Sequence, residues 1–141
     1  MVSSPSVGRV LLSLSALVSS AGAFLADWNE THIYNPRWPP HAKFHNGQTM
    51  SMGVALAVAT LYYTWRTVPS SQRRESLFTA AVFGSIYFIS ALSAILYPDS
   101  KGMDPEFGEG FVQAGPFSAC VLMNWVGYWM EIRRLRAEKI H

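Results

Sequence analysis

The sequence predicts an all-α fold: a four-helix transmembrane bundle with both termini in the cytoplasm. Hydrophobic residues make up 50% of the 141-residue chain and charged residues only 14%, well below the roughly 25% that is usual in soluble domains. Four long segments carry no formal charge, and a helix that crosses the hydrocarbon core needs about 20 such residues. The basic residues also gather on one side of these segments, which gives the bundle an orientation.

The predicted helices follow these uncharged segments in order. Within a single domain spanning residues 1–141, we expect transmembrane helices at about 10–26, 47–65, 76–97 and 111–130. Four buried helices of a soluble bundle are the alternative, but helices of that kind show a charged stripe and these segments show none.

Each segment has a feature of its own. The first contains several serines, which suits a packed membrane helix, although Ala21-Gly22-Ala23 also resembles the cleavage site of a signal peptide. The second lies between Lys43 and Arg66, and the third is rich in Ala, Gly and Ser, which permit close helix packing. The fourth contains Gly115-Pro116, which we expect to kink the helix or loosen its first turns.

Basic residues are divided unequally between the two ends of these helices. The end with the termini carries Arg9, Arg66, Arg73, Arg74, Arg133, Arg134, Arg136 and Lys139. The opposite end carries only Arg37, Lys43 and Lys101. Since basic flanks stay in the cytoplasm, we expect a basic cytoplasmic tail at 131–141. The His-rich loop 27–46, with a glycosylation sequon at Asn29, and the acidic loop 98–110 would then both be lumenal.

The His-rich loop holds three of the four histidines of the chain. His41 and His45 are four residues apart and share one face if Pro39-Pro40 begins a helix there. His32 would have to fold back toward them. Two or three histidines with a carboxylate can bind iron or zinc, but histidines without a metal also serve as acids, bases or hydrogen-bond donors. Both interpretations remain open, beside a purely structural one.

Other candidate site residues lie at the same end of the predicted bundle. Asp27 directly follows an apolar segment, where a carboxylate is costly unless it is paired or functional. Two amides, Gln48 and Gln113, are expected to line a pocket mouth and Trp38 to form a pocket wall, whereas Asn124 is expected to be structural. Partner carboxylates are available at Asp99, Asp104, Glu106 and Glu109.

The segment DWNETHIYNPRWPPHAKFHNGQ resembles the signature of a family of small four-helix membrane proteins found in fungi, some encoded beside specialised-metabolite genes. The chain matches each element of that pattern: Asp-Trp-Asn, Thr-His, Asn-Pro, Trp-Pro-Pro-His, Phe-His and Gln. Similarity to the norbornene-forming Diels–Alderase of sordarin-type biosynthesis implies a cyclase. The resemblance implies a site at Asp27, His32, Asn35, Trp38, His41, His45 and Gln48.

These observations together predict a multi-pass membrane enzyme of the endoplasmic reticulum. It would cyclise or isomerise a hydrophobic terpenoid or polyketide intermediate, using Asp27, His32, Asn35, His41 and His45, without a metal or cofactor. The alternatives are an oxidase or oxygenase with iron or zinc at His32, His41 and His45, and a non-catalytic carrier or accessory protein. Expected partners are the substrate, the lipid bilayer and other pathway enzymes. The net charge of +2 argues against nucleic acid, and a single cysteine, Cys120, rules out an intrachain disulfide.

Overall fold

The protein consists of four long helices joined by loops. The computed structural model describes residues 5–138, which contain no β-strand, so the predicted all-α class is confirmed. The helical segments are α1 (Val7–Leu17), the π-helix η1 (Val18–Gly22), α2 (Ala23–Asp27), α3 (Pro40–Trp65), the 3₁₀-helix η2 (Ser70–Gln72), α4 (Arg73–Ser93), the 3₁₀-helix η3 (Ala94–Leu96) and α5 (Ala114–Ala137). The first three run together as one long helix, Val7–Asp27, and η2, α4 and η3 form another, Ser70–Leu96.

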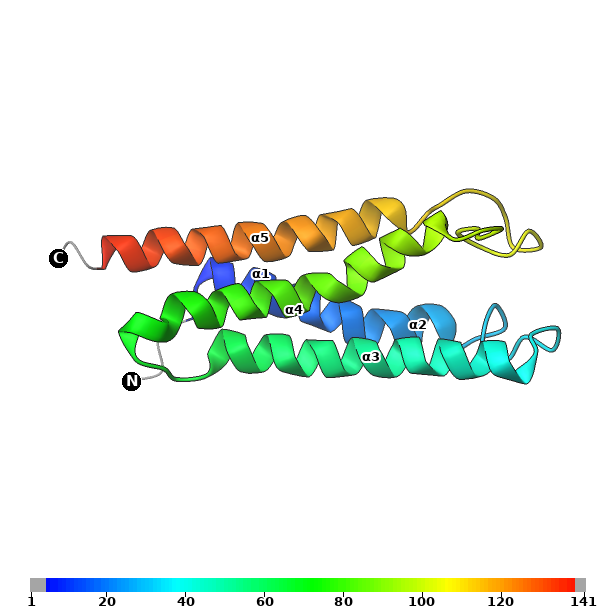
Figure 1. Ribbon diagram of the computed structural model, residues 1–141, viewed down its shortest axis with the longest axis horizontal. Coiled ribbons are helices and arrows are strands. Elements are labelled where there is room, and N and C mark those ends of the chain that lie inside the picture. The colour runs from blue at the N-terminus through cyan, green and yellow to red at the C-terminus, as the bar shows by residue number, and fades with distance from the viewer. Residues whose placement is uncertain (1–4, 139–141) are drawn as a thin grey trace.

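The four long helices run up and down in a bundle (Figure 1). Each packs mainly against two neighbours: α1 lies against α3 and α5, and so does α4, while α1 and α4 contact each other less extensively. The α1 helix begins, and the α5 helix ends, at one end of the bundle. The two long loops, 28–39 and 97–113, lie together at the opposite end. The predicted grouping of these two loops at one end is therefore correct.

Several predicted boundaries were wrong. The second long helix begins at Pro40 rather than near residue 47, so His41 and His45 lie in a helix and the His-rich loop is shorter than 27–46. Pro40 occupies the first helical position, where a missing N–H costs nothing. The last helix covers Ala114–Ala137 rather than 111–130. Pro116 therefore sits in its first turn. The expected basic tail is helical as far as Ala137, and its residues 139–141 lie outside the described part of the chain.

The interior of the bundle combines apolar residues such as Leu12 and Phe88 with many small and polar ones, and large apolar side chains also cover the outside. Ser15, Thr60 and Asn124 are 0% exposed, while Leu25 is 83% and Leu96 82% exposed. Asn124 donates to Ser15 Oγ at 2.7 Å and so joins α5 to α1, the interhelical role expected of such an amide. The many exposed large apolar side chains and the small buried residues suit a lipid environment, where small residues let helix backbones approach.

The π-helix in the first long helix was not predicted. Ser19 and Ser20 both donate their hydroxyl groups to the Ala16 carbonyl, at 3.0 Å each. In a π-helix the main-chain hydrogen bonds span five residues instead of four, and serine hydroxyl groups can then donate to carbonyls near the change of pattern. The serines that suggested a packed helix therefore mark a local irregularity, and it lies beside the cavity described below.

By length and composition, two of the long helices qualify as membrane-spanning candidates. These are Val7–Asp27 and Ser70–Leu96. The other two, α3 and α5, do not meet the same standard. The α3 helix contains His41, Lys43 and His45 in its first turns, and α5 contains Glu131 and three arginines toward its end.

Candidate functional site

A cavity of about 1000 Å³ occupies the loop end of the bundle. All four long helices and both long loops contribute to its wall. Its deeper lining is mainly apolar and includes Leu56, Ile86, Ala91 and Phe117. Five of the predicted site residues also line it: Asp27, His32, Trp38, Gln48 and Gln113. Such a combination of apolar wall and few polar groups is typical of a small-molecule site.

Asp27 and His32 form the polar centre of this cavity. Asp27 is the last residue of α2, and its Oδ2 accepts a 2.8 Å hydrogen bond from Asn46 Nδ2 on α3. The other oxygen, Oδ1, lies 3.8 Å from His32 Nε2. That separation exceeds hydrogen-bond length, so neither atom satisfies the other, and a group that lies beside the pair could contact both.

A chain of hydrogen bonds holds the His32 ring in this position. Asn29 donates to the Ala26 carbonyl at 2.7 Å, and Asn29 Oδ1 accepts from the Thr31 hydroxyl at 2.6 Å. Thr31 has only one hydroxyl proton. Its 2.7 Å contact with His32 Nδ1 must therefore use a proton on Nδ1. With a proton on Nδ1, the ring nitrogen that faces Asp27 is Nε2.

Trp38 closes one side of this centre and ties the two loops together. Its ring meets that of His32 edge to face, with centroids 4.9 Å apart. Its indole nitrogen donates to Asp104 Oδ2 at 2.9 Å. Two further contacts join the loops: Asn35 Nδ2 donates to Glu106 at 3.3 Å, and Arg37 forms an ion pair with Glu106. The acidic loop therefore covers the His-rich loop, as its carboxylates suggested.

Asn35 has a different environment from the cavity residues. It is only 1% exposed, and its Oδ1 accepts from the Arg37 main-chain N–H at 2.9 Å. Its amide nitrogen donates to Glu106, so both polar atoms of the Asn35 side chain form hydrogen bonds within or between the two loops. We therefore assign Asn35 a positioning role rather than contact with a substrate.

His41 and His45 lie together on one face of α3, as their spacing predicted. Their Nε2 atoms are 3.0 Å apart, and His45 Nδ1 lies 3.2 Å from Gln48 Oε1. Both histidines are exposed and neither lines the cavity. Within residues 5–138, no group of three or more His, Cys, Asp or Glu side chains is placed to hold one metal ion. The arrangement thus gives no support to shared iron or zinc ligation by His32, His41 and His45.

The two glutamines in the wall differ in their bonding. Gln113 donates to the Gly102 carbonyl at 2.6 Å, and its Oε1 is buried with no partner among the described residues. A buried acceptor without a partner is costly, so Gln113 can receive a hydrogen bond from a bound molecule. Gln48 is exposed and its Oε1 is near His45.

Three contributing residues were missed from the sequence. Asn46 holds Asp27, Thr31 holds His32, and Tyr87 from α4 lines the cavity. Thr31 belongs to the sequon and to the Thr-His element of the signature, and neither indicates a contact with the His32 ring. Asn46 stands among polar residues of the His-rich segment, one residue before the predicted helix, so no pattern singles it out.

We expect the bond between Trp38 and Asp104 to stabilise the cover over the cavity. In a double-mutant cycle of Trp38→Phe and Asp104→Ala, the coupling free energy should be about 1 kcal/mol, because the bond is charge-assisted but partly exposed. Thermal unfolding of the four proteins in detergent measures it. Strictly additive effects would contradict a direct bond.

The comparisons with known proteins place the chain without assigning an activity. No curated protein and no solved structure matches it. A family model described as "Family of unknown function (DUF6640)" matches residues 11–141. Since this match covers nearly the whole chain, including the His-rich loop, the acidic loop and all the cavity residues, the protein belongs to the DUF6640 family.

Proposed function

We propose that the protein is a multi-pass membrane enzyme, resident in the endoplasmic reticulum, whose four long helices all cross the bilayer. Support for spans at α3 and α5 comes from their outward residues: Val58 is 62% and Leu122 65% exposed. A soluble bundle would not present large aliphatic side chains to water on all its helices. The basic residues at the end with the termini favour cytoplasmic termini and lumenal loops.

The substrate class follows from the cavity. A volume of about 1000 Å³ accommodates a drug-sized molecule, and the apolar lining favours a hydrophobic one such as a terpenoid or polyketide intermediate. The Asp, His and Lys side chains of the lining, those of Asp27, His32, Lys101 and Asp104, lie at the loop end, while Thr49, Tyr87 and Ser90 add only hydroxyl groups from the helices. A substrate with one oxygen function would therefore place that function beside Asp27 and His32 and bury its hydrocarbon part among the helices.

The reaction we favour is cyclisation or isomerisation. The observation that carries it is the Asp27–His32 pair, whose Oδ1 and Nε2 atoms lie 3.8 Å apart in the cavity wall, with the His32 ring held by Thr31. In an isomerisation, the pair removes a proton from one substrate carbon and returns it to another, with no net oxidation. In a Diels–Alder cycloaddition, a protonated Nε2 donates to a carbonyl oxygen and polarises the dienophile, while the cavity holds the reacting ends together.

A carrier or accessory protein is the second candidate. The cavity alone would serve a carrier, because holding a hydrophobic molecule does not require a proton-transfer pair. The oxidase alternative has less support, since it needs His32, His41 and His45 on one ion and they do not converge among the described residues.

The test begins with deletion of the gene and metabolite profiling. We expect one hydrophobic intermediate to accumulate. Membranes from the deletion strain should convert that intermediate only after the protein has been expressed again from a plasmid. The product should have the same elemental composition as the intermediate. A product that gains oxygen or loses hydrogen would exclude cyclisation and isomerisation. Restored transport of the intermediate with no conversion would identify a carrier.

A further inference from the structure

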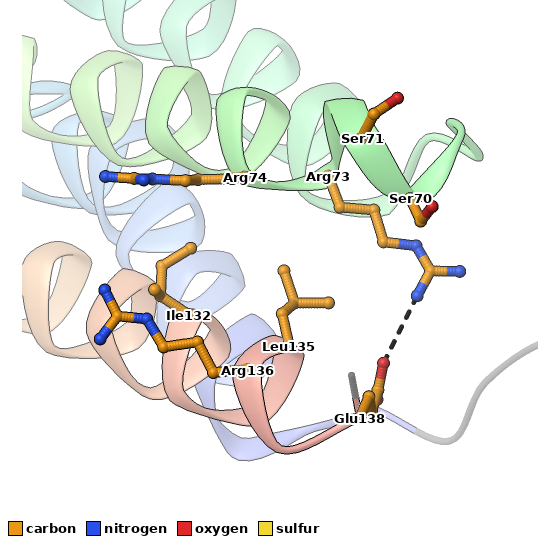
Figure 2. Close-up of a pocket in the computed structure, with 8 residues that line it drawn as sticks. All are labelled: Ser70, Ser71, Arg73, Arg74, Ile132, Leu135, Arg136 and Glu138. Atoms are coloured by element: carbon orange, nitrogen blue, oxygen red, sulfur yellow. Dashed lines mark ion pairs between the residues drawn. The ribbon is translucent and has the colours of Figure 1, made fainter. Parts of the chain in front are cut away.

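A second cavity lies at the opposite end of the bundle. Its volume is about 460 Å³, and it lies between η2 with the start of α4 and the last turns of α5 (Figure 2). Three guanidinium groups line it, those of Arg73, Arg74 and Arg136. Between them, Ile132 and Leu135 form an apolar floor. The cavity therefore combines positive charge with an apolar surface.

Two of the three guanidinium groups have no carboxylate partner among residues 5–138. Arg73 pairs with Glu138, with 3.5 Å between Nη1 and Oε2, and Glu138 also contacts Arg134 at 3.1 Å. Arg74 and Arg136 take part in none of the ion pairs of the described residues. In Figure 2 their side chains extend in the same direction from α4 and α5, with Ile132 between them. Two cations placed in this way would both be stabilised by one shared anion.

The opposite side of the cavity carries hydroxyl groups. Ser70 and Ser71 line it from η2, beside Arg73 and away from the guanidinium groups of Arg74 and Arg136 (Figure 2). The carboxyl end of α5 carries the negative end of its helix dipole, but Arg134 and Arg136 in its last turn offset it.

We propose that this cavity binds the phosphate group of an anionic phospholipid. Guanidinium groups bind phosphate oxygens with paired, charge-assisted hydrogen bonds. Free phosphate shares that chemistry, but the apolar floor of Ile132 and Leu135 favours a phosphate attached to acyl chains. The cavity also lies at the end that carries most of the basic residues, and the cytoplasmic leaflet is rich in anionic lipids. This step rests on the proposed membrane orientation and not on the proposed reaction.

The test titrates the full-length protein in detergent with dioleoyl phosphatidic acid, dioleoyl phosphatidylcholine or inorganic phosphate and counts adducts by native mass spectrometry. We expect one saturable phosphatidic acid per chain. Loss of two guanidinium contacts in the R74Q/R136Q variant should weaken it by about 10-fold or more. Arg133 is the matched control: it lies on the same helix beside Ile132, stacks on Trp129 at 4.8 Å and does not line the cavity. The R133Q variant should bind like the wild type.

A second substitution should increase the affinity for phosphatidic acid instead of lowering it. Glu138 lines the cavity and occupies Arg73, so Glu138→Gln should strengthen phosphatidic acid binding. The proposal is overturned if R133Q loses as much affinity as the R74Q/R136Q variant, since that would reflect surface charge alone. It is also overturned if phosphatidylcholine or inorganic phosphate binds as tightly as phosphatidic acid. Turnover is not measured here, so failure of the lipid site leaves the proposed enzyme untouched.

Discussion

Replacement of His32 by Gln, or of Asp27 by Asn, should lower conversion of the accumulated intermediate by about 10²–10⁴-fold, the usual contribution of a positioned acid or base. Each change keeps the size of the side chain and most of its hydrogen-bonding capacity. In the Asp27→Asn variant, the new amide oxygen could still accept the hydrogen bond from Asn46, which bonds Asp27 at 2.8 Å, so the fold should remain. The measurement is the turnover rate in membranes with equal amounts of each variant.

His41 and His45 supply the matched controls. Both are exposed on α3 and outside the cavity lining, although the sequence marked them as strongly as His32. The single variants His41→Gln and His45→Gln should turn over within about two-fold of the wild type, because surface substitutions are usually mild. A large loss in these two with full activity in the His32 variant would move the reacting centre from the cavity to the surface of α3.

The sequence predicted the class of fold because its main signals are local and periodic. Four uncharged segments gave four helices, and the i, i+4 spacing after Pro39-Pro40 placed His41 and His45 on one face. The predicted ends of α3 and α5 were wrong because the prediction let each helix end at the first charged residues. α3 includes His41 and Lys43, and α5 continues through Arg133 and Arg136. A helix can extend past the membrane with charged turns, and composition alone does not show where it ends.

The site was predictable only in its components. Asp27, His32 and Trp38 were identified from residue type and position, but their partners come from distant parts of the chain. The contact between Trp38 and Asp104 crosses 66 positions, and no local pattern encodes such a pairing. The same limit hid Glu131, which is 1% exposed and meets Ser6, Arg9 and Arg134 at the other end of the bundle. From the sequence it was only the first residue of a basic tail.

The largest expected effect on stability is at Gly53, where α3 crosses η1. A Cβ added at this position would overlap the Ser19 main-chain carbonyl and lie 3.2 Å from the Tyr87 ring. A carbonyl oxygen of a neighbouring helix cannot rotate away as a side chain can. Gly53→Ala should therefore push the two helices apart and lower the free energy of unfolding by about 1–3 kcal/mol, as overpacking does.

Gly47, on the same helix, separates this clash from a general effect of alanine. Nothing lies within 4 Å of a Cβ added there, so Gly47→Ala should stabilise α3 by about 0.4–1 kcal/mol through lower entropy of the unfolded chain. Thermal unfolding in detergent should move down for Gly53→Ala and up for Gly47→Ala. Equal shifts of the two melting temperatures would show that η1 can move to accommodate the added methyl group at low energetic cost.

The Gly53→Ala substitution should also change the cavity, because Val18 and Gly22 of η1 line it together with Tyr87. We thus expect Gly53→Ala to lower turnover even at temperatures where the protein stays folded, through the shape of the cavity rather than the chemistry of Asp27 and His32.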